Sequence, residues 1–362
     1  MNRGARMPAE RTAQRFRLQA LACEALGSPL YSGLLNHAAG DLLSGGPTAA
    51  ALEAHLDDPG RTALALRMLG GVHALVLTGR ASELAAFYPS AGGTADPGPG
   101  AERAWPAMRS VLAEQSDEVK AWLGHPPQTN EVGRGAALVG ALCHLAAQAN
   151  CPVRLIEVGA SAGLNLRADH FRITGRGVSV GPASSPVQMP DAWLGSLPPA
   201  REISIVERTG GDLAPIDPVS EAGRLRLSAY VWADQVARFQ RLRGACDLAA
   251  EIPAVMRTEP ASATVAGIKL EPGTWTVLWH SIMRQYLDQE QNAALDAGVA
   301  RLGAEATGSA RFAHISLELV KGTADTPIEL VTWPGGVRRR LGTASPHGLP
   351  VVFETHPSAR SW

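Results

Sequence analysis

The stretch EVGASAG, from Glu157 to Gly163, combines an acid, two glycines and small side chains directly after a short apolar run. Gly159 would let a ligand approach the bare backbone, and Gly163 would let a following helix pack closely against the strand. Ser161 and Asn165 are candidates for hydrogen bonds to a ligand, or for simple caps of that helix. The pattern predicts a strand-to-helix turn that holds a nucleotide-like cofactor, with a purely structural corner as the alternative.

Two common nucleotide-binding motifs do not match this turn. In the dinucleotide fingerprint G-x-G-x-x-G, a second glycine stands where this chain has Ser161. A P-loop needs G-K-S/T at the start of the helix, where this chain has Gly163 followed by leucine and asparagine. The spacing E-x-G-x-x-x-G therefore disfavours a dinucleotide site and excludes a P-loop.

Three acids follow the ends of later predicted strands. Glu207 closes EISIVE, Asp212 lies in the loop ERTGGDLAPID, and Glu259 follows PAVMRT. In an open parallel sheet, ligands bind at the carboxyl ends of the strands near the point where the strand order reverses. We therefore expect these acids at the same edge of the sheet as the glycine turn, although each alone is also typical of a solvated loop.

The turn resembles the first motif of class I S-adenosylmethionine-dependent methyltransferases, [ED]-x-G-x-[GS]-x-G. In that class an acid at the end of the second strand binds the ribose hydroxyls, and another after the third strand lies near the adenine amino group; Glu207 and Glu259 are similar. The resemblance implies S-adenosylmethionine as the cofactor. The implied binding residues are Glu157, Gly159, Ala160, Ser161, Gly163, Asn165, Glu207, Asp212 and Glu259.

Candidates for the chemistry come from two further segments. His280 ends TWTVLWHS, and this class usually places substrate-contacting residues at the end of the fourth strand; a histidine titrates near neutral pH and suits a general base. The alternative is a histidine that only bonds a neighbouring carbonyl. Asn130 and Glu131 lie in QTNEVGR, before the first strand, where such enzymes often fold a segment over the cofactor. The alternative is that Thr129 or Asn130 is a plain helix cap. The four cysteines form no CxxC, and no metal site is expected.

The elements that must position these residues fall into two regions. Helical periodicity dominates residues 1–125, and strands alternate with helices in residues 126–362. The expected fold class is α/β, a Rossmann-like, methyltransferase-type sheet that is mostly parallel with an antiparallel C-terminal strand, preceded by a helical N-terminal domain that caps it. About fifty residues separate Glu157 from Glu207, against about twenty in a compact βαβ unit, so an insertion is expected near residues 175–199. Strands are expected at 153–159, 202–210, 253–261, 274–281, 311–319, 327–333 and 349–354, and helices at 13–26, 62–79, 104–123, 135–149, 161–171, 222–250 and 282–303.

Composition narrows the class of partner. The chain has 33 basic and 34 acidic residues, so its net charge of −1 favours neither nucleic acid nor an anionic membrane. The N-terminus lacks the apolar segment of a signal peptide, and the longest apolar run, 135–149, is too short to span a bilayer. We expect a cytoplasmic protein with reduced thiols and a small-molecule substrate; the sequence does not predict its oligomeric state.

Nearly the whole chain resembles a bacterial family known only as domain of unknown function number 2332. The matching pieces are GSPLY, QTNEVGR, EVGASAGLNL, ERTGGDLAPIDP, VWADQ and PHG, between residues 28 and 348. That family has no settled activity to carry over. The leading expectation is an S-adenosylmethionine-dependent methyltransferase acting on a small molecule. The alternatives are a different reaction on the same fold, or a non-catalytic scaffold or partner subunit.

Overall fold

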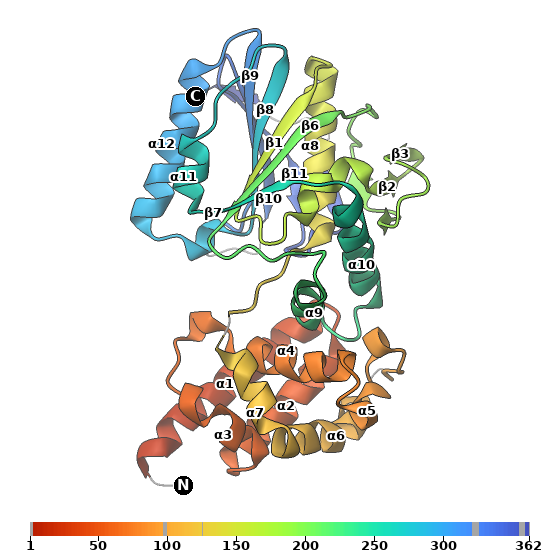
Figure 1. Cartoon of the computed structure of the whole chain (residues 1–362), viewed down its shortest axis with the longest axis vertical. Coiled ribbons are helices and arrows are strands. Elements are labelled where there is room, and N and C mark those ends of the chain that lie inside the picture. Colours follow the sequence, from red (N-terminus) through yellow and green to blue (C-terminus); the bar gives the residue numbers. More distant parts are fainter. Residues whose placement is uncertain (1–2, 97–99, 125, 321–325, 355–358, 362) are drawn as a thin grey trace. The chain divides into compact units, whose positions relative to one another are not determined.

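The computed structural model describes residues 3–96, 100–124, 126–320, 326–354 and 359–361. Two compact units divide the chain. The first, the helical unit, comprises Met1–Thr129 and Glu221–Gln240; the second, the sheet unit, comprises Asn130–Ser220 and Arg241–Trp362 (Figure 1). The expected boundary near residue 125 lies close to the first division, but residues 221–240, which the sequence placed in the second domain, pack with the first.

The helical unit is built from amphipathic helices around one apolar core. In α1, Ala9, Ala13, Phe16, Ala20 and Cys23 are buried at spacings of three and four, so one stripe of the helix faces the core. Up to Asn150 the described residues form helices and no strand, as the sequence predicted. The helices are α1 (Arg3–Ala25), α2 (Pro29–Leu43), α3 (Pro47–Leu52), α4 (Leu64–Leu77), α5 (Ser82–Ala85), α6 (Gly100–Glu114), α7 (Ser116–Leu123) and α9 (Glu221–Ala229), with 3-10 turns η1 (Glu53–His55), η2 (Gly60–Thr62) and η3 (Pro89–Ala91).

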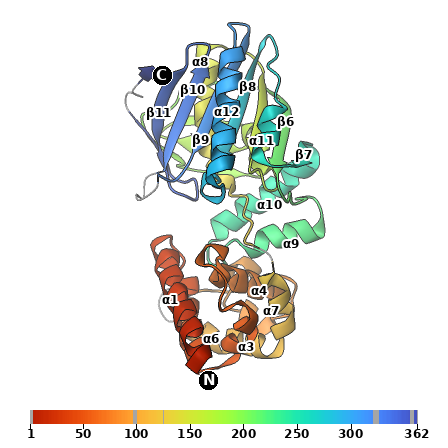
Figure 2. The same ribbon diagram turned by 90° about the vertical axis from the view of Figure 1, so that its left-hand side faces the viewer.

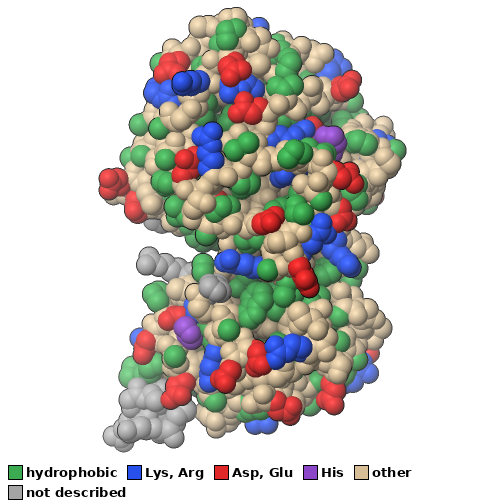
Figure 3. Space-filling model, viewed as in Figure 1, with side chains coloured by type: hydrophobic (Ala, Val, Ile, Leu, Met, Phe, Trp, Pro, Cys, Tyr) green, Lys and Arg blue, Asp and Glu red, His purple; other side chains and the backbone are tan. Residues whose placement is uncertain are grey.

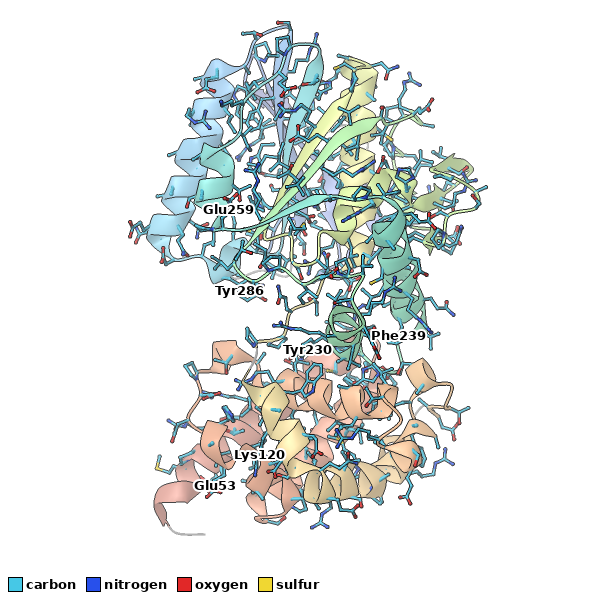
Figure 4. All side chains as sticks on the ribbon, viewed as in Figure 1. Glu53, Lys120, Tyr230, Phe239, Glu259 and Tyr286 are labelled. Carbon is cyan, nitrogen blue, oxygen red and sulfur yellow. The ribbon has the colours of Figure 1, made fainter. Side chains whose placement is uncertain are left out.

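Residues 222–250, expected as one helix, form two. A turn at residues 230–235 separates α9 from α10 (Val236–Glu251). In this turn the Asp234 carboxylate accepts hydrogen bonds from Ser28 Oγ at 2.5 Å and Leu30 N at 3.1 Å. The ring of Tyr230 packs so closely on Gly70 of α4 that a Cβ there would lie 2.6 Å from it (Figure 4). These contacts explain why the segment belongs to the helical unit.

The sheet unit is centred on a large, mostly parallel sheet. Its strand order is β5-β12-β11-β10-β9-β8-β1-β6-β7, and β13 pairs with β11. The pairs from β7 across to β9 are parallel. The pairs β9–β10, β10–β11, β11–β12 and β11–β13 are antiparallel, and the edge strand β5 runs parallel to β12. The strands of this sheet are β1 (Val153–Val158), β5 (Trp193–Gly195), β6 (Ile205–Asp212), β7 (Val255–Thr258), β8 (Thr274–Ser281), β9 (Ala310–Leu317), β10 (Pro327–Trp333), β11 (Val337–Ala344), β12 (Val351–Phe353) and β13 (Ala359–Ser361).

Helices cover both faces of this sheet. α11 (Ala261–Ala266) and α12 (Gln289–Glu305) lie on one face and α8 (Gly135–Gln148) on the other (Figures 1 and 2). Alternate residues of the strands point to opposite faces, so Ile156, Leu278 and Phe312 pack into the core beneath α11 and α12. The remaining short helical segments of this unit are η4 (Val132–Arg134), η5 (Leu164–His170) and η6 (Arg284–Tyr286).

Two expectations for the strands need correction or refinement. The segment between 327–333 and 349–354 was expected to be a loop, but its arginines form β11, which pairs with both β10 and β12. Ion pairs from Arg338 to Glu329 and from Arg340 to Glu354 offset the charges of this strand. The insertion expected near 175–199 contains most of a small sheet, in the order β3-β2-β4, and the edge strand β5. The small sheet consists of β2 (Arg172–Gly175), β3 (Val178–Val180) and β4 (Gln188–Met189).

Three further observations concern the surface, the helices and the cysteines. On the face in view in Figure 3, acidic and basic side chains are interspersed. Within the described parts of the chain, none of the helices combines the length and the hydropathy that a bilayer crossing requires. The cysteines Cys23, Cys143, Cys151 and Cys246 are all free thiols.

Candidate functional site

The strand order reverses between β1 and β8. The chain runs from β1 outward to β6 and β7 on one side, and β8 and β9 then line up on the other side of β1. The carboxyl ends of β1 and β8 therefore form the topological switch point, the position at which ligands bind in open α/β sheets. The turn that follows β1 begins there.

Left-handed backbone at three alternate residues shapes this turn. Gly159, Ser161 and Gly163 have φ of 66°, 54° and 64°. Gly159 is exposed, and its N–H donates to Gly211 O at 2.9 Å, which ties the turn to β6. The following segment, predicted as a helix, is the 3-10 helix η5 rather than an α-helix.

Gly163 is required for two reasons. Its positive φ disfavours any side chain, and a Cβ there would lie 2.6 Å from Met256 Sδ on β7, two strands away from β1 in the sheet. At Gly159 a Cβ would lie 2.9 Å from Met283 Cβ, beyond the end of β8. Gly163 thus allows close packing against Met256, and Gly159 leaves exposed backbone without a side chain.

Glu157 is the buried acid of the site. It lies in β1 opposite Trp279 of β8, and its Oε2 has no hydrogen-bond partner in the described parts of the chain. Burial raises the pKa of this carboxyl from 4.5 to about 8, and the nearby Asp212 adds to the rise, while Trp279 and the positive charges of Arg134 and Arg167 oppose it. At neutral pH this carboxyl is mostly protonated, and a cationic ligand group beside it would favour its ionised form.

Asp212 holds the ends of three strands together. Its Oδ2 accepts from Ser161 N at 2.8 Å, its Oδ1 accepts from Ala214 N at 2.9 Å, and its carbonyl accepts from Glu259 N at 3.0 Å. Glu259 itself follows the carboxyl end of β7, and its Oε1 accepts from Thr264 Oγ1 at 3.0 Å (Figure 4). Both acids therefore lie at the carboxyl edge of the sheet, with the glycine turn.

The expectation that Glu207 closes the second strand was wrong. β6 continues to Asp212, and Glu207 lies next to Arg154, near the start of β1. Its Oε2 accepts from Arg154 Nε at 2.6 Å. The apolar pattern of EISIVE ends at Glu207, but the strand extends through Thr209, Gly210 and Gly211, so Asp212 takes the position at the strand end.

Asn130 and Glu131 lie directly against the turn. Asn130 Oδ1 accepts from Leu164 N at 2.7 Å, and the carbonyl of Glu131 accepts from Asn165 Nδ2 at 3.2 Å. The Glu131 side chain caps η4 by accepting from Gly133 N. Both residues therefore hold the turn in place. The cap of η4 is Glu131, whereas the alternative from the sequence named Thr129 or Asn130 as the cap.

Three side-chain oxygens around the turn are buried acceptors without a hydrogen-bond partner among the described residues. They are Glu157 Oε2, Ser161 Oγ and Asn165 Oδ1. Buried polar atoms of this kind carry a free-energy cost unless a partner satisfies them. A ligand that presents hydrogen-bond donors, such as an ammonium group, fits this acceptor set.

His280 lies on the other face of the sheet from Glu157. Because neighbouring residues alternate, Trp279 shares the face of Glu157, and His280 points toward α12. Its Nδ1 lies 2.7 Å from Glu318 Oε1 and its Nε2 lies 2.9 Å from His314 Nε2. The structure therefore pairs His280 with two side chains of the β9 region, and not with the glycine turn.

A model of a single protein family matches residues 13–352, almost the entire chain. It describes an uncharacterized protein conserved in bacteria, DUF2332. This chain belongs to that family. No curated protein and no solved structure matches it.

In this DUF2332 protein, Arg134 lies in the predicted segment QTNEVGR; it donates to Ser281 O at 3.2 Å and acts on Glu157 through its charge. Two further residues, His314 and Glu318, belong to no motif of the sequence. His314 and Glu318 reach His280 only because β9 pairs with β8. The alternation of His314, Ser316 and Glu318 along a predicted strand was the one available sign that they share a face.

Proposed function

We propose that this DUF2332 protein is an S-adenosylmethionine-dependent methyltransferase that acts on a small molecule. The observation that carries the proposal is the exposed, left-handed Gly159 turn at the switch point between β1 and β8. Asp212 and Glu259 follow the ends of the next two strands at the same edge. This arrangement fits the Rossmann-like fold of class I methyltransferases, in which one turn and two acids share the cofactor.

The residues fit the three parts of the cofactor. The buried acceptor Glu157 Oε2 and the acceptors on Ser161 and Asn165 suit the ammonium group of the methionine part. Asp212 replaces Glu207 as the candidate for the ribose hydroxyls, because an ionised carboxylate has lone pairs beyond the two that Ser161 and Ala214 use. Glu259 is the candidate for the adenine amino group.

Within this proposal the protein positions the reactants. The cofactor supplies the methyl group, and transfer requires its sulfonium and the acceptor to be held in line. Asn130 and Asp212 fix the turn through its backbone N–H groups, so the turn is preorganised before a ligand arrives. The balanced charge of the chain favours a small acceptor over a nucleic acid.

Calorimetric titration with S-adenosylhomocysteine, the demethylated product, tests the proposal. Wild-type protein should bind one molecule per chain, and Asp212→Asn should weaken binding by about tenfold or more. Glu207→Gln is the matched control, since it alters the other acid of β6 and should leave binding unchanged. Absence of binding to folded wild-type protein at high micromolar concentration would overturn the cofactor assignment.

A further inference from the structure

A second candidate site lies on the α12 face of the sheet. A cavity of about 680 Å³ extends there over β8, β9 and β10. His280, His314 and Glu318 line it together with Trp333, Val331 and Val299. Its volume lies in the range of small-molecule sites, which combine apolar walls with a few convergent polar groups.

A chain of hydrogen bonds leads into this cavity. The Glu318 carboxylate lies 2.7 Å from Nδ1 of His280, and Nε2 of His280 lies 2.9 Å from Nε2 of His314. Both Glu318 oxygens also accept backbone N–H groups, from Met283 at 3.2 Å and from Arg284 at 3.3 Å. These four hydrogen bonds fix the positions of the three side chains, in the order Glu318, His280, His314.

The order of this chain sets the proton positions for a neutral His280. The Glu318 carboxylate accepts from Nδ1 of His280, and in the neutral imidazole the other nitrogen, Nε2, is then an acceptor. His314 must then donate from Nε2, which leaves its Nδ1 with a lone pair. Nδ1 of His314 forms no hydrogen bond in the described parts of the chain. Burial, together with the positive charges of Arg284 and Arg338, holds the pKa of His314 well below its ordinary value. His314 is therefore a neutral hydrogen-bond acceptor.

The other charges of the lining are compensated within the protein. Arg284 pairs with Asp296, and Arg338 lies 3.5 Å from Glu329. Because these charges are paired, the lining favours neither an anionic nor a cationic ligand. In the described part of the chain, no group of three or more His, Cys, Asp or Glu side chains is arranged to hold a metal ion. The polar end of the cavity is thus an acceptor for a neutral donor.

We propose that this cavity binds an uncharged aromatic compound with a hydroxyl group, which donates a hydrogen bond to Nδ1 of His314. The aromatic part lies along Val299, Val331 and Trp333. His280 and Glu318 are positioning residues, because they fix the tautomer of His314 without contacting the ligand. This site is separate from the glycine turn and does not depend on the proposed methyl transfer.

Two probes that differ only in the group on the phenolic oxygen test the proposal. 4-Ethylphenol has a hydroxyl donor, and in 4-ethylanisole a methyl group replaces that proton. Calorimetry should show that wild-type protein binds the phenol about tenfold more tightly than the anisole. His314→Phe should bind the two compounds equally, and His170→Phe, outside the cavity, should retain the preference.

Nitrogen-15 NMR of the histidine side chains provides a readout that does not depend on a variant. In wild-type protein without ligand, the His314 Nδ1 resonance should have the chemical shift of an unprotonated nitrogen. It should move when 4-ethylphenol is added and stay in place when 4-ethylanisole is added. Glu318→Gln should change the tautomer of His314 and reduce the preference for the phenol. Equal affinities for the two probes, binding of neither, or a protonated His314 Nδ1 in wild-type protein would overturn the proposal.

Discussion

The Asp212 carboxylate, at the end of β6, accepts a hydrogen bond from the backbone N–H of Ser161 at 2.8 Å, across the turn that follows β1. Ser161 adopts a left-handed conformation with φ of 54°. This bond holds a strained residue at the switch point of the sheet, where a ligand would meet the backbone. The stability of the turn and, under the proposed function, its affinity for the cofactor therefore depend on the same carboxylate.

Asp212→Asn should lower both stability and cofactor affinity. An amide can accept at one position only, so one of the two N–H groups of Ser161 and Ala214 loses its partner, at a cost of about 1–3 kcal/mol. Thermal melting followed by circular dichroism measures this loss, with Glu207→Gln as the control. A melting temperature equal to that of wild type would show that the bond does not support the turn.

Ser161→Gly should separate backbone strain from ligand binding. Glycine removes a left-handed cost of about 1–2 kcal/mol but adds flexibility worth about 0.5–1 kcal/mol, so stability should stay level or rise slightly. The control is Arg176→Gly, a second left-handed residue, with φ of 43°, which is exposed and lies away from the turn. Only Ser161→Gly removes the buried Oγ. Only this variant should therefore show a lower affinity for S-adenosylhomocysteine in calorimetric titration. Equal affinities in both variants would show that Ser161 Oγ does not contact the ligand.

Gly163→Ala should destabilise the sheet unit more than Gly177→Ala. Both glycines have positive φ, 64° and 84°, and so share the backbone penalty of about 1 kcal/mol. Only at Gly163 would the new Cβ meet Met256 Sδ, at 2.6 Å, whereas Gly177 has no atom within 4 Å of that position. Melting temperatures of the two variants measure the difference. Similar decreases would mean that Met256 moves aside without cost.

The pKa of Glu157 makes stability depend on pH. Burial raises this pKa from 4.5 to about 8, so between these values the folded protein holds a proton that the unfolded chain releases. Stability should fall as pH rises through this window, by up to about 1.4 kcal/mol per pH unit for this group. Glu157→Gln removes this loss, so its melting temperature should exceed that of wild type by a margin that grows from about pH 5 to about pH 8. A constant difference would show that Glu157 is ionised in the folded protein.

Asp234→Ala should loosen residues 221–240 within the helical unit. The substitution removes acceptors for Ser28 Oγ and Leu30 N, at a cost of about 1–3 kcal/mol. Hydrogen exchange of the 26–31 and 230–236 segments should become faster. The control Asp117→Ala removes an exposed carboxylate of α7 and should change exchange little. Unchanged protection in Asp234→Ala would contradict the assignment of this turn to the helical unit's packing.

Local patterns predicted much of the fold. The bounds of β8 and β10 agree with the expected strands because both are short runs rich in β-branched and aromatic residues, and α1, α4 and α8 follow apolar spacing. The glycine turn was predictable for the same reason, since its residue types are adjacent in the sequence. These features need no information about distant partners.

Long-range pairing explains the misplaced elements. The three consecutive arginines of β11 suggest a solvent-exposed loop when read from the sequence, yet Glu329 and Glu354 pair with two of them across the sheet. Register alone decides that Asp212 and not Glu207 reaches the strand end. The partners of His280 lie 34 and 38 residues further along the chain, and only the pairing of β8 with β9 brings them together.

Titration of folded wild-type protein with S-adenosylhomocysteine tests the central claim most directly. The account predicts saturable binding of one molecule per chain, weakened in Asp212→Asn and unchanged in Glu207→Gln. No binding at high micromolar concentration, in protein whose fold circular dichroism verifies, would contradict the assignment of the Gly159 turn as a cofactor site.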